Sequence, residues 1–294
     1  NRRDGDLGTW AAGALRWHEP ALTVGAYGAY RNIRRYDADR VMHYLVDVAW
    51  RWRARADEAL SVTWSGEVAY VGGELRHTDD DGGGGRIEAM QLGGATRLDI
   101  ADHEHGLGYI LEAGYASGDS DPDDALDQRF LMDPARGIGA ILFEEVLARS
   151  SAQTYARWLG GREPGSRERP DLYPSNGAVH GAVYIAPRVT LELCDGCIQL
   201  AAGGLVAFAP QDVSAPSEGD SEPSNAYGGE ATSGVLGYEA NAGAKMGFKF
   251  DKEHSVMVGA QWALFIPGEA LAAADDELGL GLIQKWRITA DVTW

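Results

Sequence analysis

Several features are scarce in this chain of 294 residues. Only 2 residues are cysteines, which excludes a small scaffold held together by many disulfides. The 26 Lys and Arg residues are outnumbered by 44 Asp and Glu residues, and the net charge of −18 argues against a nucleic-acid partner, whose phosphates would be repelled. No run approaches the roughly 18–20 apolar residues that a membrane-spanning helix needs.

What is present is alternation of apolar and polar side chains along the whole chain. In "VMHYLVDVAWRW", Tyr44, Val46 and Val48 fall on one face, while His43 and Asp47 fall on the other. This period of two is typical of β-strands with one apolar face. Eleven such segments are predicted, near residues 8–18, 21–34, 40–55, 59–76, 86–101, 106–118, 178–193, 197–210, 234–250, 254–267 and 278–294.

The lengths of these segments indicate strands that cross a membrane. Soluble strands have about 5–6 residues, whereas a membrane-crossing strand needs about 9–11 residues plus whatever projects beyond the bilayer. Aromatic residues gather near segment ends, as at Trp50 and Trp52, which is typical of interfacial girdles. Alternation alone would also fit a soluble sandwich, but length and aromatic placement favour a transmembrane barrel.

The links between the segments alternate between short and long. This alternation is typical of an up-and-down barrel with periplasmic turns and extracellular loops. The sequence therefore predicts one all-β domain, residues 1–294: an antiparallel up-and-down barrel of at least 11–12 strands in the bacterial outer membrane. Short turns are expected at 18–21, 55–59, 101–106, 194–197 and 251–254, and long loops near 77–86, 119–177, 211–233 and 268–277.

The last segment ends at Trp294, with apolar residues alternating before it. This ending resembles the C-terminal signal of bacterial outer-membrane barrels. Counting back from it, the first segment begins on the long-loop side. Bacterial barrels have even strand numbers, so we expect a barrel larger than the visible segments, with at least one strand before Asn1 unless a further strand lies within 138–177.

One stretch, "GYASGDSDPDDALDQRFLMDPARGIGAILFEEVLARSSAQTYAR", resembles the alginate-export-like outer-membrane porins and the related myxobacterial-type barrel proteins. It covers roughly a seventh of the chain. The resemblance implies a large barrel, a diffusion or export pore and no catalytic residues. It is carried by residues 114–119, Asp121, Asp123, Asp124, Arg129, Phe130, Asp133, Pro134 and "ILFEEVLARSSAQTYA".

The same stretch contains a group of carboxylates. They resemble a calcium loop in composition but lack the central Gly and the final Glu of an EF-hand. A weakly bound Ca²⁺ that also bridges lipopolysaccharide phosphates, and a merely solvated acidic loop, both remain open. No other cofactor is expected. The carboxylates are Asp119, Asp121, Asp123 and Asp124.

The apolar spacing of residues 138–147 predicts a short helix within the long extracellular loop 119–177. The helix could fold into the lumen as a constriction or cap the rim of the barrel. Farther along, Cys194 and Cys197 flank Asp-Gly, a strong hairpin signal. A structural disulfide across that hairpin is predicted, with a free dithiol as the alternative.

The two faces of the strands are assigned by their chemistry. Large side chains such as Trp50, Trp64, Tyr238, Phe248, Trp262 and Trp286 are predicted to face lipid. The polar faces are predicted to line the lumen, with acids such as Glu67, Glu239 and Asp291 opposing the cations. The basic residues there are Arg51, Arg188, Lys245, Lys249, Lys285 and Arg287.

These features predict a passive channel rather than an enzyme, because no Ser/His/Asp set falls on neighbouring strands. The expected partners are the lipid bilayer, lipopolysaccharide and either a hydrophilic solute or an exported anionic polysaccharide. Lys245 with Lys249, and Lys285 with Arg287, would form a basic ladder along the lumen unless acids such as Glu239 and Asp291 neutralise them. The alternative is a structural, adhesion or complex-scaffold barrel with an occluded lumen.

Overall fold

The fold is a set of long antiparallel strands, seen here in a computed structural model. It describes residues 7–34, 40–78, 84–119, 125–149, 178–194, 196–213, 225, 227, 229–249, 255–273 and 280–293. Within them the strands are β1 (Leu7–His18), β2 (Leu22–Arg34), β3 (Arg40–Ala56), β4 (Leu60–Thr78), β5 (Gly84–Asp102), β6 (Leu107–Ala116), β7 (Leu126–Asp127), β8 (Ala182–Leu193), β9 (Ile198–Ala209), β10 (Gly234–Lys249), β11 (Ser255–Pro267) and β12 (Ile283–Thr293). Each predicted segment contains a strand.

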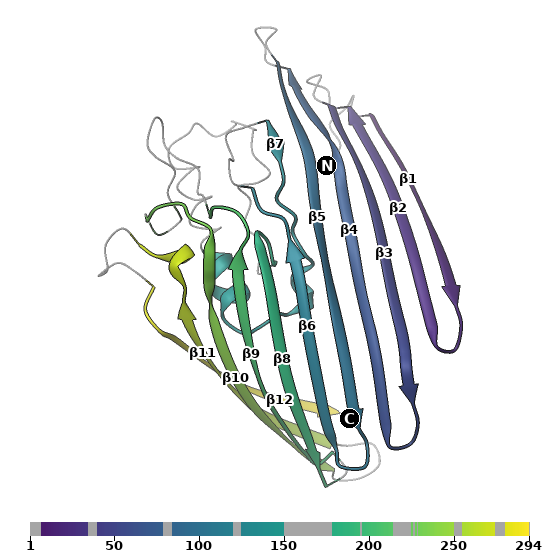
Figure 1. Cartoon of the computed structure of the whole chain (residues 1–294), viewed down its shortest axis with the longest axis vertical. Coiled ribbons are helices and arrows are strands. Elements are labelled where there is room, and N and C mark those ends of the chain that lie inside the picture. Colours follow the sequence, from purple (N-terminus) through teal and green to yellow (C-terminus); the bar gives the residue numbers. More distant parts are fainter. Residues whose placement is uncertain are drawn as a thin grey trace.

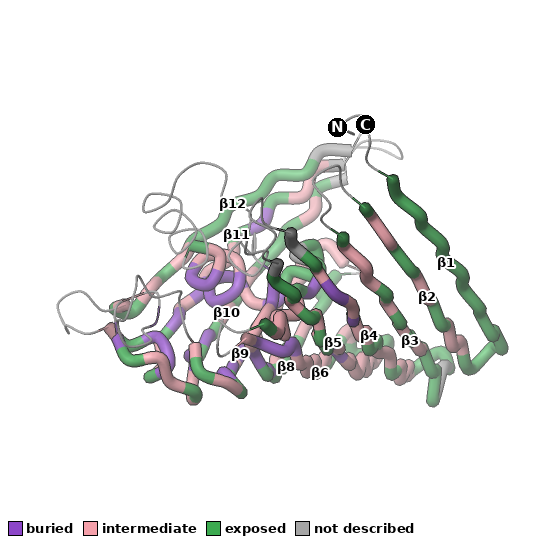
Figure 2. Tube along the Cα trace, turned by 90° about the horizontal axis from the view of Figure 1, so that it is seen from above, coloured by how far each residue is buried: buried purple, intermediate pink, exposed green. Residues whose placement is uncertain are grey.

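All these strands belong to one sheet, in the order β1-β2-β3-β4-β5-β6-β8-β9-β10-β11-β12, with the short β7 added in parallel beside β5. Consecutive long strands are antiparallel neighbours, which confirms the all-β, up-and-down prediction. The turns that join β1 to β2, β3 to β4, β5 to β6 and β8 to β9 lie at one end of the sheet, and β2, β4, β6 and β9 end at the opposite end (Figure 1). The sheet curves strongly, as the view from above shows (Figure 2).

The strand order begins at β1 and ends at β12, and no ladder joins these two strands among the described residues. The closed barrel predicted from the sequence is therefore not shown; the described strands form an open, curved sheet. Every residue of β1 is exposed, as expected for a strand with one neighbour and no cover on either face.

Side-chain carboxylates fix the short turns. After β3, Asp57 accepts hydrogen bonds from the N–H groups of Ala59 at 3.1 Å and Leu60 at 2.7 Å. After β5, Asp102 accepts a hydrogen bond from the N–H of His105 at 3.0 Å. Aspartates favour such turns because they bond to their own backbone two or three residues on. The predicted turns at 55–59 and 101–106 are confirmed, while 251–254 lies outside the described residues.

The convex face of the sheet carries an exposed apolar band with aromatic borders. Near one border the rings of Tyr44 and Tyr70 lie 6.0 Å apart, and near the other the rings of Trp52 and Trp64 lie 6.5 Å apart. Val46 between them is 51% exposed. The register places the residues predicted to face lipid on this same face: Trp50, Trp64, Tyr238, Phe248, Trp262 and Trp286.

Two aromatic rings on β3 lie over glycines of β4. Trp50 is paired with Gly66, and Tyr44 with Gly72. A Cβ added at either glycine would collide with the ring above it. The absence of a side chain therefore lets each ring lie against the neighbouring backbone.

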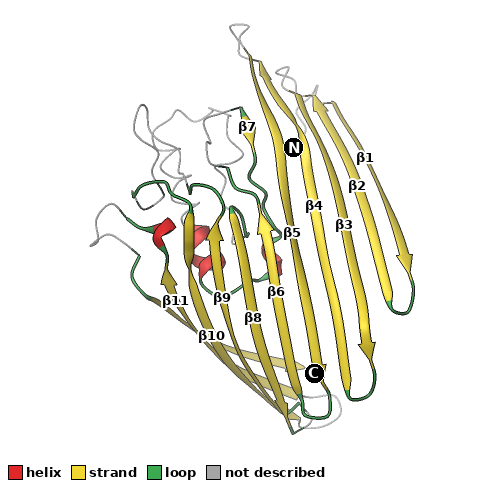
Figure 3. Cartoon of the chain, viewed as in Figure 1, coloured by secondary structure: helices red, strands yellow, loops and turns green. Residues whose placement is uncertain are grey.

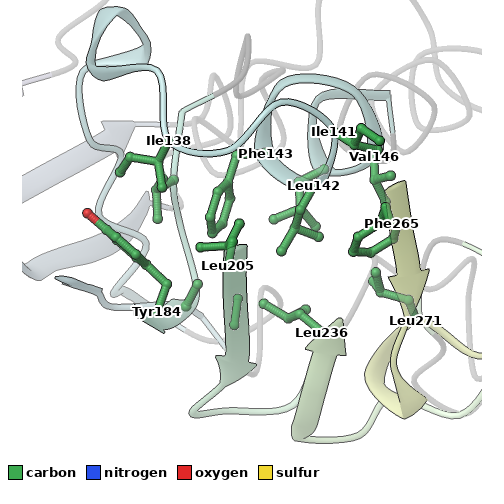
Figure 4. Close-up of a cluster of buried hydrophobic side chains, with 14 of the residues drawn as sticks. Ile138, Ile141, Leu142, Phe143, Val146, Tyr184, Leu205, Leu236, Phe265 and Leu271 are labelled. Carbon is green, nitrogen blue, oxygen red and sulfur yellow. The ribbon is translucent and has the colours of Figure 1, made fainter. Parts of the chain in front are cut away.

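The buried core lies on the concave face of the C-terminal half of the sheet, as the view from above shows (Figure 2). Its centre is the π-helix η2 (Leu142–Leu147), which appears in red in Figure 3. In the close-up, Phe143 lies beside Leu205, and Leu142 lies above Leu236 (Figure 4). Among the described residues, no helix is long and apolar enough to cross a membrane.

The last strand starts later than its alternation predicts. β12 begins at Ile283, so residues 280–282 of the predicted segment 278–294 are not strand, while 278 and 279 lie outside the described residues. Leu280 packs against the buried core, whereas Leu282 is 59% exposed. Leu280 therefore serves the interior rather than the convex face, and its predicted place on the strand was wrong.

Candidate functional site: a segment folded onto the concave face

The chain leaves β6 at Ala116 and later crosses the concave face of the sheet. The part that lies on this face, residues 130–149, is called here the inward segment. Ser117, which is 6% exposed, anchors this path. Its hydroxyl accepts from the N–H of Leu92 at 3.0 Å, and its carbonyl accepts from the N–H groups of Phe130 at 3.0 Å and Gly181 at 3.3 Å. One residue thus ties the sheet to both the outgoing and the returning chain.

Glu239 of β10 clamps the start of helix η2. It is 4% exposed, and its carboxylate accepts hydrogen bonds from the N–H groups of Ala140 at 2.6 Å, Ile141 at 3.0 Å and Leu142 at 3.1 Å. These N–H groups have no partner within a helix, and a carboxylate also suits the positive end of the helix dipole. Among the described residues no cation forms an ion pair with Glu239, so these three hydrogen bonds compensate its burial.

A second set of contacts comes from β12. The Lys285 ammonium donates to the carbonyl of Ala140 at 2.8 Å and pairs with Glu144 at 3.1 Å and Glu145 at 2.8 Å. Arg287 also pairs with Glu144, at 2.9 Å. The hydrogen bond from Lys285 holds the pKa of the Glu145 carboxyl below its ordinary value. Two of the predicted lumen cations therefore hold the inward segment.

The third tether is on β6 and β8. Arg136 pairs with Glu112 at 3.1 Å, and the Tyr184 hydroxyl donates to the same carboxylate at 3.0 Å. The ring of Tyr184 meets that of Phe143 edge-on, with centroids 5.9 Å apart. Polar contacts on both sides and apolar contacts in the middle therefore fix the inward segment across β6 to β12.

Below the inward segment, toward the short turns, the concave face encloses a polar hollow of about 410 Å³. Three predicted lumen residues, Arg188, Lys245 and Arg287, line it together with the acids Glu192 and Asp291. Neutral hydrogen-bonding groups such as Asn241, Gln261 and Thr289 complete the wall. Such a mixed wall can solvate a hydrophilic solute without holding it tightly.

The remaining predicted site residues are distributed differently. Arg51 lies on the concave face of β3, lining a separate hollow with Asp47. The side chain of Lys249 lies outside the described residues, so its half of the basic ladder stays a prediction. Near the last strand, the expected neutralising acids were Glu239 and Asp291, but Glu144 and Glu145 bind the cations instead. The segment that carries these glutamates lies between Glu239 and β12.

The metal prediction is only partly within the described residues. Asp119 is described, whereas Asp121, Asp123 and Asp124 are not. Among the described residues, no three His, Cys, Asp or Glu side chains are grouped to hold a metal ion. The weak Ca²⁺ site therefore stays a prediction, as does the extracellular position of the whole 119–177 link, because 150–177 also lie outside the described residues.

The cysteine hairpin differs in detail from the expected two-residue turn. The last paired residues are Leu193 and Ile198, so four residues form the loop. Cys194 has a left-handed φ of 51°, and the N–H of Cys197 donates to its carbonyl at 3.2 Å. The disulfide between these cysteines stays a prediction.

Neither a protein-family model nor a curated protein matches this sequence. Among solved structures the chain is similar to CdiB from Escherichia coli, with 10% identity and a TM-score of 0.40 over 97% of this chain and 46% of that one. It is similar to the outer membrane protein OprD from Pseudomonas aeruginosa, with 12% identity and a TM-score of 0.42 over 95% and 67% of the two chains. It is also similar to Acinetobacter baumannii OccAB1, with 8% identity and a TM-score of 0.37 over 97% and 68%. The chain thus spans less than half the length of the CdiB chain.

Proposed function

We propose that this chain forms the wall of a channel in the bacterial outer membrane that passes hydrophilic solutes, and that the inward segment sets its narrowest part. The observation that carries the proposal is the fixation of the inward segment on a polar concave face by Glu239, Lys285 and Arg287. The exposed apolar band on the opposite face, with its aromatic borders, supports placement in a bilayer.

We further propose that the channel favours anionic solutes, with an anionic polysaccharide as one candidate. The polar hollow is lined by the cations Arg188, Lys245 and Arg287 and by the acids Glu192 and Asp291. Because Arg287 is paired with Glu144, Arg188 and Lys245 are the two cations on which this preference depends. An anionic group that enters meets several weak positive sites in succession, which is how a pore binds a solute without trapping it.

A structural barrel with an occluded lumen is the second candidate. The observation that favours it is the apolar underside of the inward segment, where Ile141, Leu142 and Phe143 are almost completely buried against the sheet. A segment that is packed this well need not move, and it could block the passage.

Single-channel recording in planar bilayers separates the two candidates. Discrete conductance steps are expected for the channel, and an insertion without steps would favour the occluded barrel. In a salt gradient, the double variant Arg188→Gln/Lys245→Gln should shift the reversal potential toward cation preference. The charge-conserving pair Arg188→Lys/Lys245→Arg should leave it near that of the unmodified protein. An unchanged anion-to-cation permeability ratio in the Gln variant would contradict the proposed anion preference.

A further inference from the structure

Four arginines form a row across the convex face near the long-loop end of the sheet. Arg34 of β2 is paired with Arg40 of β3, Arg40 with Arg76 of β4, and Arg76 with Arg86 of β5. Paired residues share one face of a sheet, and neighbouring strands lie about 4.8 Å apart, so the row spans about 14 Å. All four side chains are exposed.

The row places like charges directly opposite one another, which destabilises a sheet unless counter-charges are present. Among the described residues, only Glu74 and Glu88 form ion pairs with it. Glu74 meets Arg76 at 3.0 Å and Arg86 at 3.1 Å, and Glu88 meets Arg86 at 2.9 Å. Arg40 donates instead to the neutral amide of Asn32, at 3.3 Å. Among the described residues, the four cations thus face two carboxylates.

Glu74 gives the row its order. Its side chain is only 8% exposed, and it holds two guanidinium groups while their own exposures remain 54% and 56%. An arginine fixed in this way keeps outward donors available for a second, planar or tetrahedral anion. Glu74 therefore positions Arg76 and Arg86. It does not prevent their guanidinium groups from binding a further anion.

The height of the row places it near the outer edge of the headgroup layer of a bilayer. Arg40 lies four residues beyond Tyr44, which stands at the aromatic border. Four residues extend about 13 Å along a strand, or about 10 Å along the membrane normal at a tilt of about 40°. The headgroup region begins at the aromatic border and extends about 5–8 Å on each side of the hydrocarbon core, so the row lies at its outer edge or just beyond it.

We propose that the arginine row binds the phosphate groups of a phosphorylated glycolipid in the outer leaflet. This inference rests on the proposed placement in the outer membrane. Arginine suits phosphate because its donors form two parallel hydrogen bonds to one anion. The row lies on the convex face of β2–β5, so the bound lipid would lie on the face of the sheet opposite to the inward segment.

The matching test measures lipid binding to the full chain in detergent micelles, by native mass spectrometry. Three probes are compared: a diphosphorylated acyl glucosamine disaccharide, the same lipid without phosphates, and inorganic pyrophosphate. The double variant Arg34→Gln/Arg40→Gln leaves the Glu74 ion pairs intact, so it should fold. Arg31→Gln is the matched control, since Arg31 lies on β2 but on the concave face. The quadruple variant adds Arg76→Gln and Arg86→Gln.

We expect the phosphorylated lipid to bind best, the double variant to bind it on the order of tenfold more weakly, and Arg31→Gln to bind it normally. Equal binding of the phosphate-free lipid, or of pyrophosphate, would overturn the proposal. Unchanged binding by the double variant would also overturn it, because the lipid would then bind without Arg34 and Arg40. Conductance is recorded in parallel. Phosphate-dependent binding without conductance would contradict the channel alone, and conductance without phosphate preference would contradict the arginine row alone.

Discussion

The two halves of the sheet use their concave faces in opposite ways. In β1, Trp10 is 69% exposed although it is a large aromatic residue, whereas Phe265 in β11 is fully buried. Both lie on regular antiparallel strands of similar length, so strand geometry does not cause the difference. The cause is the inward segment, which covers β5 to β12 and leaves β1 to β3 bare. The comparison teaches that side chains on the concave face are buried only where the inward segment covers them. The inward segment itself is held in place by a few polar contacts.

Glu239→Ala is expected to have the largest effect on the attachment of the inward segment to the sheet. Three N–H groups at the start of η2 would lose their acceptor in a buried place, and a hydrogen bond to a charged group contributes about 1.5–3 kcal/mol. The inward segment should detach from the sheet. The concave face of the C-terminal half would then be exposed, as it is on β1 to β3. Limited proteolysis within 138–149 and a rise in single-channel conductance would report this. Glu192→Gln, on the same face but away from the segment, is the control; equal protease resistance in Glu239→Ala would contradict the clamp.

The next effect in size is expected from Gly139→Ala. Gly139 has a left-handed φ of 69°, and a Cβ there would lie 2.9 Å from the Glu239 carboxylate. The strain of a left-handed residue is about 1–2 kcal/mol, to which displacement of the carboxylate adds. Gly137→Ala is a matched control, because its φ is 60° but the nearest atom would be 3.9 Å away. Equal losses of thermal stability in the two variants would show that Glu239 does not contribute beyond the strain.

A smaller effect is expected from Lys285→Gln. The variant loses the ion pairs to Glu144 and Glu145 but keeps the clamp at Glu239. The inward segment should stay in place on average and become more accessible to protease, with more frequent conductance fluctuations. Lys245→Gln, which removes the same charge from the polar hollow, should change selectivity without loosening the segment. If both variants behaved alike, the contacts of Lys285 would have no special role.

Acidification is expected to have the smallest effect on the attachment of the inward segment to the sheet. Because the folded pKa of Glu145 lies below the ordinary value of 4.5, its ion pair stabilises the folded protein above that value. The stabilisation is lost as the pH falls through the lowered folded pKa. Protease accessibility of the inward segment should therefore rise at pH 3 relative to pH 7, and Lys285→Gln should show a weaker dependence. The group is partly exposed, so the change is expected to be modest. A pH profile of Lys285→Gln that matches the unmodified protein would rule out this pair as the cause.

Alternation predicted the strands and their faces because both follow from the local two-residue period. It placed Glu239 on the polar face correctly. It could not predict the partner of Glu239, because Ala140 lies 99 positions earlier and contributes only a backbone N–H. The same limit explains Leu280: an apolar residue next to a strand looks the same whether it continues the strand or packs inward. The pair Glu144-Glu145 within a helix-like stretch was the one signal that could have indicated partners for Lys285 and Arg287.

The rings of Trp50 and Tyr44 over Gly66 and Gly72 have a consequence for assembly. If β3 and β4 paired two positions out of register, Trp50 would meet Val68 or Trp64, whose side chains leave no room beneath a flat ring. Only one alignment seats both rings at once. The two glycines therefore help to specify the register of β3 and β4. In a hairpin shifted by two residues, side chains of β4 would clash with the rings of Trp50 and Tyr44 and disfavour that alignment before the next strand pairs.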